Sequence, residues 1–151
     1  MSELIEKAER LGRRLARLLM GMGFALLGLQ ALYVQLPGGP SGTPLRMADI
    51  VMLIAWCFLV LACLFAMVGG GGYGYGKQVR ALVNDETARA NRDAAIRIGF
   101  VAAMLVSLIM FVSSYFAKTD VRLTCHMVIT AGLGIAMIRY GALEKRDYRS
   151  G

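Results

Sequence analysis

The chain has 151 residues, of which 57% are apolar and 18% are charged, and its formal net charge is +7. A soluble domain has about 45–50% apolar residues, so this composition argues against a soluble enzyme, a disordered tail and a nucleic-acid-binding module. The charged residues flank long uncharged runs, which is how membrane proteins carry positive charge. We therefore expect an integral membrane protein.

The residues before the first uncharged run have an amphipathic pattern. Apolar residues recur at helical spacing opposite a basic face: Leu4, Ala8, Leu11, Leu15 and Leu18. The pattern predicts an interfacial helix at 2–17 that runs straight into the first span; a charged anchor that only fixes the topology is the alternative. Glu3, Glu6 and Glu9, with no small-residue cleavage site after the apolar run, argue against a cleavable signal peptide.

Four stretches contain no Asp, Glu, Lys or Arg: Leu18–Leu36, Ile50–Val68, Ile98–Ala117 and Leu123–Ile138. The first three hold 19, 19 and 20 residues, close to the roughly 20 that cross about 30 Å of hydrocarbon. The fourth is shorter, but Arg139 can snorkel to the interface and so extend it. Backbone groups in lipid must be satisfied within each helix. We predict an all-α fold, a four-transmembrane-helix bundle with spans at about 18–36, 47–68, 95–117 and 122–143.

The basic residues are divided unequally between the segments outside these spans. Fourteen of the 17 lie in the N-terminal segment, the middle loop or the C-terminal end, and three lie in the two short loops between paired spans. Cytoplasmic loops carry the excess of Lys and Arg. Both termini and the middle loop are therefore predicted to be cytoplasmic.

Two connections have distinctive compositions. Residues 37–44 hold all three prolines and must be irregular. Residues 69–76 contain six glycines and two tyrosines, and we expect a hinge there, within a cytoplasmic hinge and loop at 69–94. A phosphate-binding loop is the alternative, but the Gly-Lys-Ser/Thr ending and a preceding strand are missing.

The segment after the glycines is polar. Lys77–Arg97 is predicted to be one helix that continues into the third span, with acid-before-base pairs four residues apart, Asp85 with Arg89 and Asp93 with Arg97. One interpretation is a solvated helix that these pairs stabilise. The other is a docking surface for a cytoplasmic partner.

Polar residues inside the spans are few and none is acidic, which argues against a proton-coupled transporter or drug exporter. His126 is the only histidine and lies about one turn inside the outer end of the fourth span. Thr130 is four residues on and shares its face, and Trp56 is too deep for an interfacial belt and can line a pocket. The predicted cofactor-binding residues are His126, Thr130 and Trp56, with His126 as the metal ligand. The other polar residues at depth are Gln30, Gln35, Ser107, Ser113, Ser114 and Thr124.

Haem b is the cofactor that this set favours. Neutral imidazole is the usual proximal ligand of haem iron, and haem suits an apolar helical pocket. One of the ten methionines, or the partner subunit's His126 across a two-fold axis, is a candidate for the sixth ligand. Two other interpretations stay open: a histidine hydrogen-bonded to a carbonyl or hydroxyl of an adjacent helix, and a site for another metal.

Small, sulfur-containing and aromatic residues suggest how the helices pack. Small-residue faces, suited to helix contacts within the bundle or to a homodimer, are made by Gly21, Ala25 and Gly28 and by Gly132 and Ala136. Cys57 and Cys63 do not share a helix face, so we expect them to pack in the bundle and not to form a redox pair. Cys125 points about 100° away from its neighbour His126 and so is not expected to share a metal ion with it. Interfacial belts are the expected place of Tyr33, Tyr115 and Tyr140.

Three stretches in the second half of the chain resemble a group of small bacterial four-helix membrane proteins. They are Val79-Arg80-Ala81-Leu82-Val83-Asn84-Asp85-Glu86-Thr87-Ala88-Arg89-Ala90-Asn91-Arg92, the stretch around His126, and the ending Arg139-Tyr140-Gly141-Ala142-Leu143-Glu144-Lys145-Arg146. Members of the group are often encoded beside helix-turn-helix regulators of the xenobiotic-response-element type. The resemblance implies a bacterial inner-membrane protein with a regulatory role.

These observations combine into one functional hypothesis and two alternatives. The leading hypothesis is a membrane sensor or regulator that binds b-type haem through His126. We expect it to be a homodimer and not an enzyme. It would signal through the middle loop to a cytoplasmic partner such as a transcription regulator, without touching nucleic acid itself. The alternatives are an electron-transfer b-type cytochrome and a cofactor-free membrane interaction protein.

Overall fold

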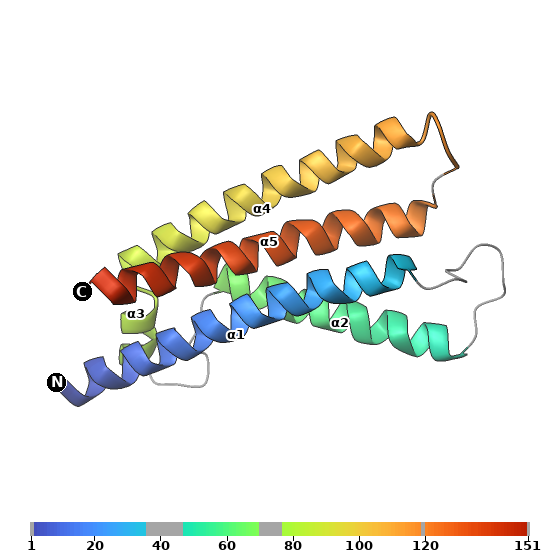
Figure 1. Ribbon diagram of the computed structural model, residues 1–151. Coiled ribbons are helices and arrows are strands. Elements are labelled where there is room, and N and C mark those ends of the chain that lie inside the picture. The colour runs from blue at the N-terminus through green and yellow to red at the C-terminus, as the bar shows by residue number, and fades with distance from the viewer. Residues whose placement is uncertain (1, 36–46, 70–76, 119, 151) are drawn as a thin grey trace.

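The computed structural model describes residues 2–35, 47–69, 77–118 and 120–150, and its regular elements in that part of the chain are all helices. They are α1 (Ser2–Gln35), α2 (Met47–Gly69), α3 (Lys77–Val83), α4 (Glu86–Ser113) and α5 (Val121–Ser150). Four long helices run side by side, alternating in direction along the chain, and the short α3 lies at the end that holds both termini (Figure 1). The all-α prediction is confirmed for the described residues.

Two helices, α4 and α5, are long and apolar enough to cross a membrane. They contain most of the predicted third and fourth spans, although α4 ends at Ser113, before the predicted limit at 117. The predicted first and second spans lie in α1 and α2. In α2 the apolar stretch is Leu53–Gly69, which is shorter than the stretches of α4 and α5.

The central helix is α5, which packs against α1 on one side and α4 on the other. Both contacts are close because glycines face each other. A Cβ on Gly99 of α4 would lie 2.5 Å from the carbonyl oxygen of Gly132, and a Cβ on Gly23 of α1 would lie 2.8 Å from that of Gly134. Gly132 and its neighbour Ala136 therefore pack within the chain, since nothing larger fits between α4 and α5.

The buried core follows this central helix and consists of Leu19, Leu26, Cys63, Met67, Ala95, Ala136, Met137 and Tyr140. Tyr140 was expected in an interfacial belt, but its side chain is only 5% exposed. The reason is the next residue, Gly141, where an added Cβ would lie 2.7 Å from the carbonyl oxygen of Ala16. This close approach of α1 covers Tyr140. Cys63 is also buried, whereas Cys57 and Cys125 are exposed, and all three are free thiols.

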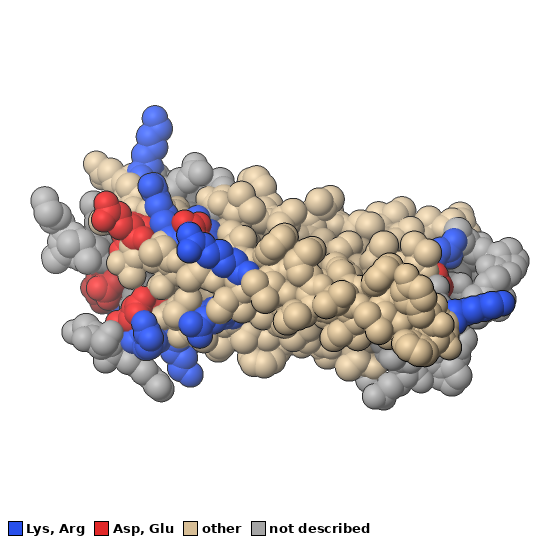
Figure 2. Space-filling view, turned by 90° about the horizontal axis from the view of Figure 1, so that it is seen from above, with Lys and Arg blue, Asp and Glu red and all other residues tan. Residues whose placement is uncertain are grey.

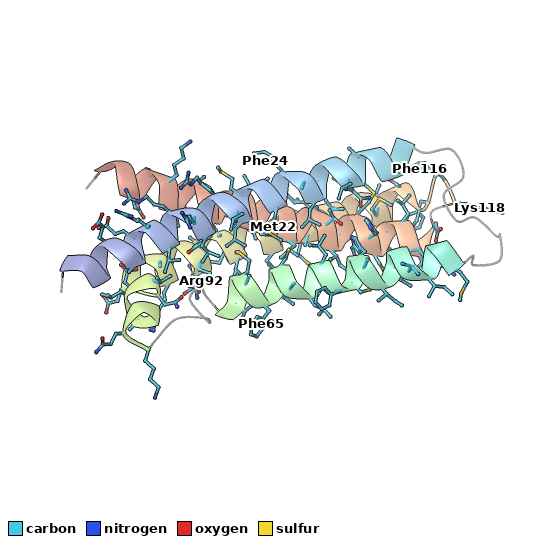
Figure 3. The ribbon with its side chains drawn as sticks, turned by 90° about the horizontal axis from the view of Figure 1, so that it is seen from below. Met22, Phe24, Phe65, Arg92, Phe116 and Lys118 are labelled. Atoms are coloured by element: carbon cyan, nitrogen blue, oxygen red, sulfur yellow. The ribbon has the colours of Figure 1, made fainter. Side chains whose placement is uncertain are left out.

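Large apolar side chains cover the outside of the bundle. On α2 they include Val51, Leu53, Ile54, Phe58, Leu61, Leu64, Phe65 and Val68, and on α4 they continue from Ile96 to Val112. Figure 2 shows the result on one face: a broad uncharged band between two ends that carry the charged residues. In Figure 3, Phe24 of α1 and Phe65 of α2 point outward from the bundle, and both are more than half exposed.

The predicted single helix at Lys77–Arg97 is wrong, because α3 ends at Val83 and α4 begins at Glu86. Asp85 is the N-cap of α4, and its carboxylate accepts a hydrogen bond of 2.7 Å from the backbone N–H of Ala88. A capping carboxylate satisfies one of the N–H groups that a helix start leaves without a partner. The Asp85 carboxylate thus binds a backbone N–H group and forms no ion pair with Arg89. The second predicted pair, Asp93 with Arg97, does not form either.

Two predicted features fall outside the described residues: the proline-containing connection and the glycine hinge, apart from its first residue, Gly69. The predicted interfacial segment 2–17 continues α1 without a break, and Figure 1 shows that it keeps the axis of the bundle. On the same helix, a Cβ on Gly21 or Gly28 would meet nothing within 4 Å, and Ala25 is exposed. The small-residue face of α1 therefore makes no contact with the described part of the chain.

Candidate functional site

His126 lies in the second turn of α5, near the end of the bundle opposite the termini. Asp120 organises the start of this helix, since its carboxylate accepts from the Arg122 N–H at 2.9 Å and its carbonyl oxygen accepts from the Thr124 hydroxyl at 3.0 Å. The close contacts of Gly134 and Gly141 with α1 set how α1 lies against α5. This antiparallel alignment brings Gln30 of α1 opposite His126.

Gln30 holds the imidazole of His126 by a hydrogen bond between the ring Nδ1 and the amide Oε1. Because the partner atom is a carbonyl-type oxygen, Nδ1 carries the hydrogen and donates it. The neutral ring then has its lone pair on Nε2. Gln30 thereby fixes the orientation of the histidine ring.

Trp56 of α2 covers one face of the same imidazole. The two ring centroids are 4.3 Å apart and the ring planes differ by 22°, which is a stacked arrangement. Such aromatic pairs stabilise by about 0.5–1.5 kcal/mol beyond the area they bury. Since α2 otherwise exposes most of its side chains and has little contact with the other long helices, this stack is its clearest attachment near the outer end.

Two polar atoms beside His126 are buried without a hydrogen bond. Gln30 is 8% exposed and Thr130 is 1% exposed, and among the described residues neither the Nε2 of Gln30 nor the Oγ1 of Thr130 has a partner. Leaving such a group unsatisfied costs about 1–3 kcal/mol. These two groups therefore lie inside the helix packing without a hydrogen bond to the described part of the chain.

The structure brings the three predicted binding residues into one region. Trp56 contacts His126 directly, and Thr130 lies one turn further along α5 on the same side. Gln30 was not predicted as a site residue. The available signal was a lone amide in an uncharged run, because polar side chains at membrane depth are expensive and usually have a role.

The arrangement suits a single-histidine site better than an all-protein metal site. Among the described residues, no three His, Cys, Asp or Glu side chains lie close enough to share a metal ion. Cys125 is exposed while His126 is partly buried, so the two neighbours point to different surroundings, as their spacing predicted. One imidazole with a fixed orientation can provide one axial ligand to a metal that a porphyrin already holds.

A second polar cluster joins α4 to α5 at the other end of the bundle. Asn91 donates from Nδ2 to Glu144 at 3.2 Å and to Asp147 at 2.7 Å, and Glu144 is only 6% exposed. Asn91 and Glu144 belong to two of the stretches that carried the sequence resemblance. Their contact shows that these stretches form one unit of structure.

Comparison of the chain with protein-family models, with curated proteins and with solved structures finds no match.

Proposed function

We propose that the chain is a multi-pass protein of a bacterial inner membrane, with four spans and both termini in the cytoplasm. The lengths of α4 and α5, the uncharged band in Figure 2 and the excess of basic residues on one side support this topology. A soluble bundle would bury the large apolar side chains that α2 and α4 expose. The chain should stay with carbonate-washed membranes, and release into the soluble fraction would contradict the proposal.

Within this topology, the proposed function is that of a membrane sensor or regulator that binds b-type haem through His126. The observation that carries it is the hydrogen bond from His126 Nδ1 to Gln30 inside an apolar bundle. Histidines that bind metals usually donate their other ring N–H to an oxygen, which orients the ring and directs the Nε2 lone pair at the metal. Trp56 and Thr130 would border the bound group.

The proposed signal travels along α5 toward the cytoplasmic loop. α5 is continuous from His126 to Glu144, whose carboxylate is held by Asn91 of α4. A shift of α5 on ligand binding or redox change would thus reach α3, α4 and the proposed hinge at 69–76. The partner would be a cytoplasmic protein, such as a transcription regulator.

The chain is also proposed to form a homodimer. The supporting feature is the exposed face of α1 at Gly21, Ala25 and Gly28, where an added Cβ at either glycine meets nothing within 4 Å. Helices associate in lipid through such small residues, because these let two backbones approach closely.

A visible absorption spectrum of the detergent-purified chain, expressed in haem-replete cells, tests the haem. The wild type is expected to show a Soret band that His126→Ala abolishes and that Cys125→Ala, the matched change at the neighbouring exposed position, leaves intact. Gln30→Leu should retain less haem, because the imidazole loses its orienting acceptor. A wild type with no Soret band would overturn the haem proposal and leave a cofactor-free interaction protein.

An electron-transfer b-type cytochrome is the second candidate. Two buried donors without partners, the Gln30 amide and the Thr130 hydroxyl, favour it, because a quinone carbonyl is an acceptor that enters from the bilayer. Reduction of the bound haem by a quinol within seconds would support electron transfer. Reduction only by dithionite would support sensing.

A further inference from the structure

A cavity of about 370 Å³ lies at the end of the bundle that holds the termini, far from His126. Figure 3 labels Arg92 at the corner where α3, α4 and the end of α2 meet. The described lining residues are Gly69, Lys77, Ala81, Asn84, Arg89 and Arg92. The volume falls within the roughly 300–1,000 Å³ of small-molecule sites.

The charge of this cavity is one-sided. Its described lining contains three cations, Lys77, Arg89 and Arg92, and no carboxylate. Three acids, Asp85, Glu86 and Asp93, lie within two residues of lining residues in the sequence, and none of them belongs to the described lining. Like charges that share a small volume repel each other, so the bare cavity favours entry of an anion.

One of the three cations, Arg92, is held in place by the break between α3 and α4. Arg92 donates from Nη2 to Oδ1 of Asn84 at 2.7 Å, and Asn84 is the first residue of that break. Because of this break, Lys77 and Ala81 of α3 and Arg89 and Arg92 of α4 line one cavity. In a single continuous helix over 77–97, these side chains would be spread along one helix and would not line a common cavity.

The cavity lies at the depth of lipid headgroups. Exposed apolar side chains end at Val68 on α2 and begin at Ile96 on α4, which marks the edge of the hydrocarbon in the proposed topology. At 1.5 Å per residue, Arg92 is about 6 Å beyond Ile96, and Arg89, about 10 Å beyond it, lies just past the headgroup layer, toward which its long side chain can reach back. The headgroup layer on each side of a bilayer is about 5–8 Å thick.

We infer that this cavity is a binding site for a phosphate group, supplied by the headgroup of an anionic phospholipid in the cytoplasmic leaflet. Guanidinium groups form paired hydrogen bonds with phosphate oxygens, and a lysine adds a point charge. Soluble phosphate has the same chemistry, but the depth of the cavity favours the lipid. The inference rests on the membrane topology and not on haem binding.

Native mass spectrometry of the full-length chain in detergent, with equal amounts of phosphatidylglycerol and phosphatidylcholine, tests the site. The wild type is expected to retain phosphatidylglycerol preferentially. The double variant R89Q/R92Q should bind it about thirty-fold more weakly, from the usual contribution of a basic residue near an anionic lipid. The matched control R14Q/K145Q removes two exposed cations at the same end but outside the cavity, and its affinity should equal that of the wild type.

Arg89→Gln alone provides a test that does not disturb the contact between Arg92 and Asn84, and about a fivefold loss is expected. Equal melting temperatures in phosphatidylcholine micelles show that a variant is folded. Equal retention of the two lipids by the wild type, or equal losses in R89Q/R92Q and R14Q/K145Q, would overturn the site. Displacement of the lipid by inorganic phosphate at matched ionic strength would overturn the lipid as its source.

Discussion

The central helix α5 and the peripheral helix α2 are both rich in apolar residues, yet they are used in opposite ways. α5 is covered on two sides, and its Thr130, Met137 and Tyr140 are almost completely buried. α2 buries Cys63 and Met67 but leaves most of its large side chains exposed. The difference lies in residue size, because Gly132, Gly134 and Gly141 let two neighbours approach α5 closely.

Apolar character therefore decides that a helix enters a membrane, and small residues decide where it packs. Lipid tails are as apolar as leucine, so a leucine-rich face gains little by leaving lipid for another helix. In the proposed membrane topology, α2 can therefore leave most of its large side chains in contact with lipid. A single polar or aromatic contact with another helix then has a large influence on where α2 lies. Substitutions at the contacts of α5 and α2 test this contrast between a closely packed helix and an exposed one.

The largest expected effect is at the contact between α4 and α5. Gly99→Leu should lower the free energy of unfolding by about 3 kcal/mol or more, because a Cβ already meets the backbone of Gly132 at 2.5 Å and one helix must move. Thermal unfolding in micelles, followed by circular dichroism, measures it. Phe100→Leu is the control, because the side chain of this neighbouring residue is 63% exposed and no loss is expected. Equal destabilisation by both would show that the close approach is not needed.

A smaller effect is expected at the attachment of α2. Trp56→Ala should cost about 1–2 kcal/mol and raise amide hydrogen exchange in α2 more than in α5, since it removes the stack on His126. Phe58→Ala, two residues on, removes a side chain that is 75% exposed and should change neither quantity. If α2 exchanges at the same rate in both variants, other contacts hold it.

The smallest effect is expected inside α5, where two threonines differ in their hydrogen bonds. Thr130→Val should leave the ligand-free protein equally stable or more stable by up to about 1 kcal/mol, because it removes a buried hydroxyl without a partner. Thr124→Val should lose about 0.5–1.5 kcal/mol, since the Thr124 hydroxyl donates to Asp120. A clear loss in Thr130→Val would mean that its hydroxyl has an acceptor.

The all-α fold was predictable because the membrane imposes a simple rule on long uncharged runs. The proximity of Trp56 and His126 was also within reach, since the chain has one of each and both lie at depth. The hydrogen bond between Gln30 and His126 was not predictable in the same way. It depends on how far α1 is displaced along α5, and the glycine contacts that set this appear only when the helices are placed together.

The break between α3 and α4 was missed for a different reason. Charge spacing over 85–97 suited a continuous helix, but Asp85 before Glu86 is also a good N-cap, and the two patterns compete. In the structure Asp85 caps α4, the helix is broken before it, and the expected ion pairs do not form. Tyr140 was misplaced because its burial depends on the glycine beside it and not on its own chemistry.

The unbroken course of α5 has a mechanical consequence. Its 19 residues from His126 to Glu144 span about 27 Å as one stiff element. Close contacts with Gly99 and Gly23 hold α5 between two neighbours, so a shift of α5 acts on both of them. In the proposed function, occupancy of the site at His126 would thus be passed by a shift of this one helix to Glu144 at the other end of the bundle.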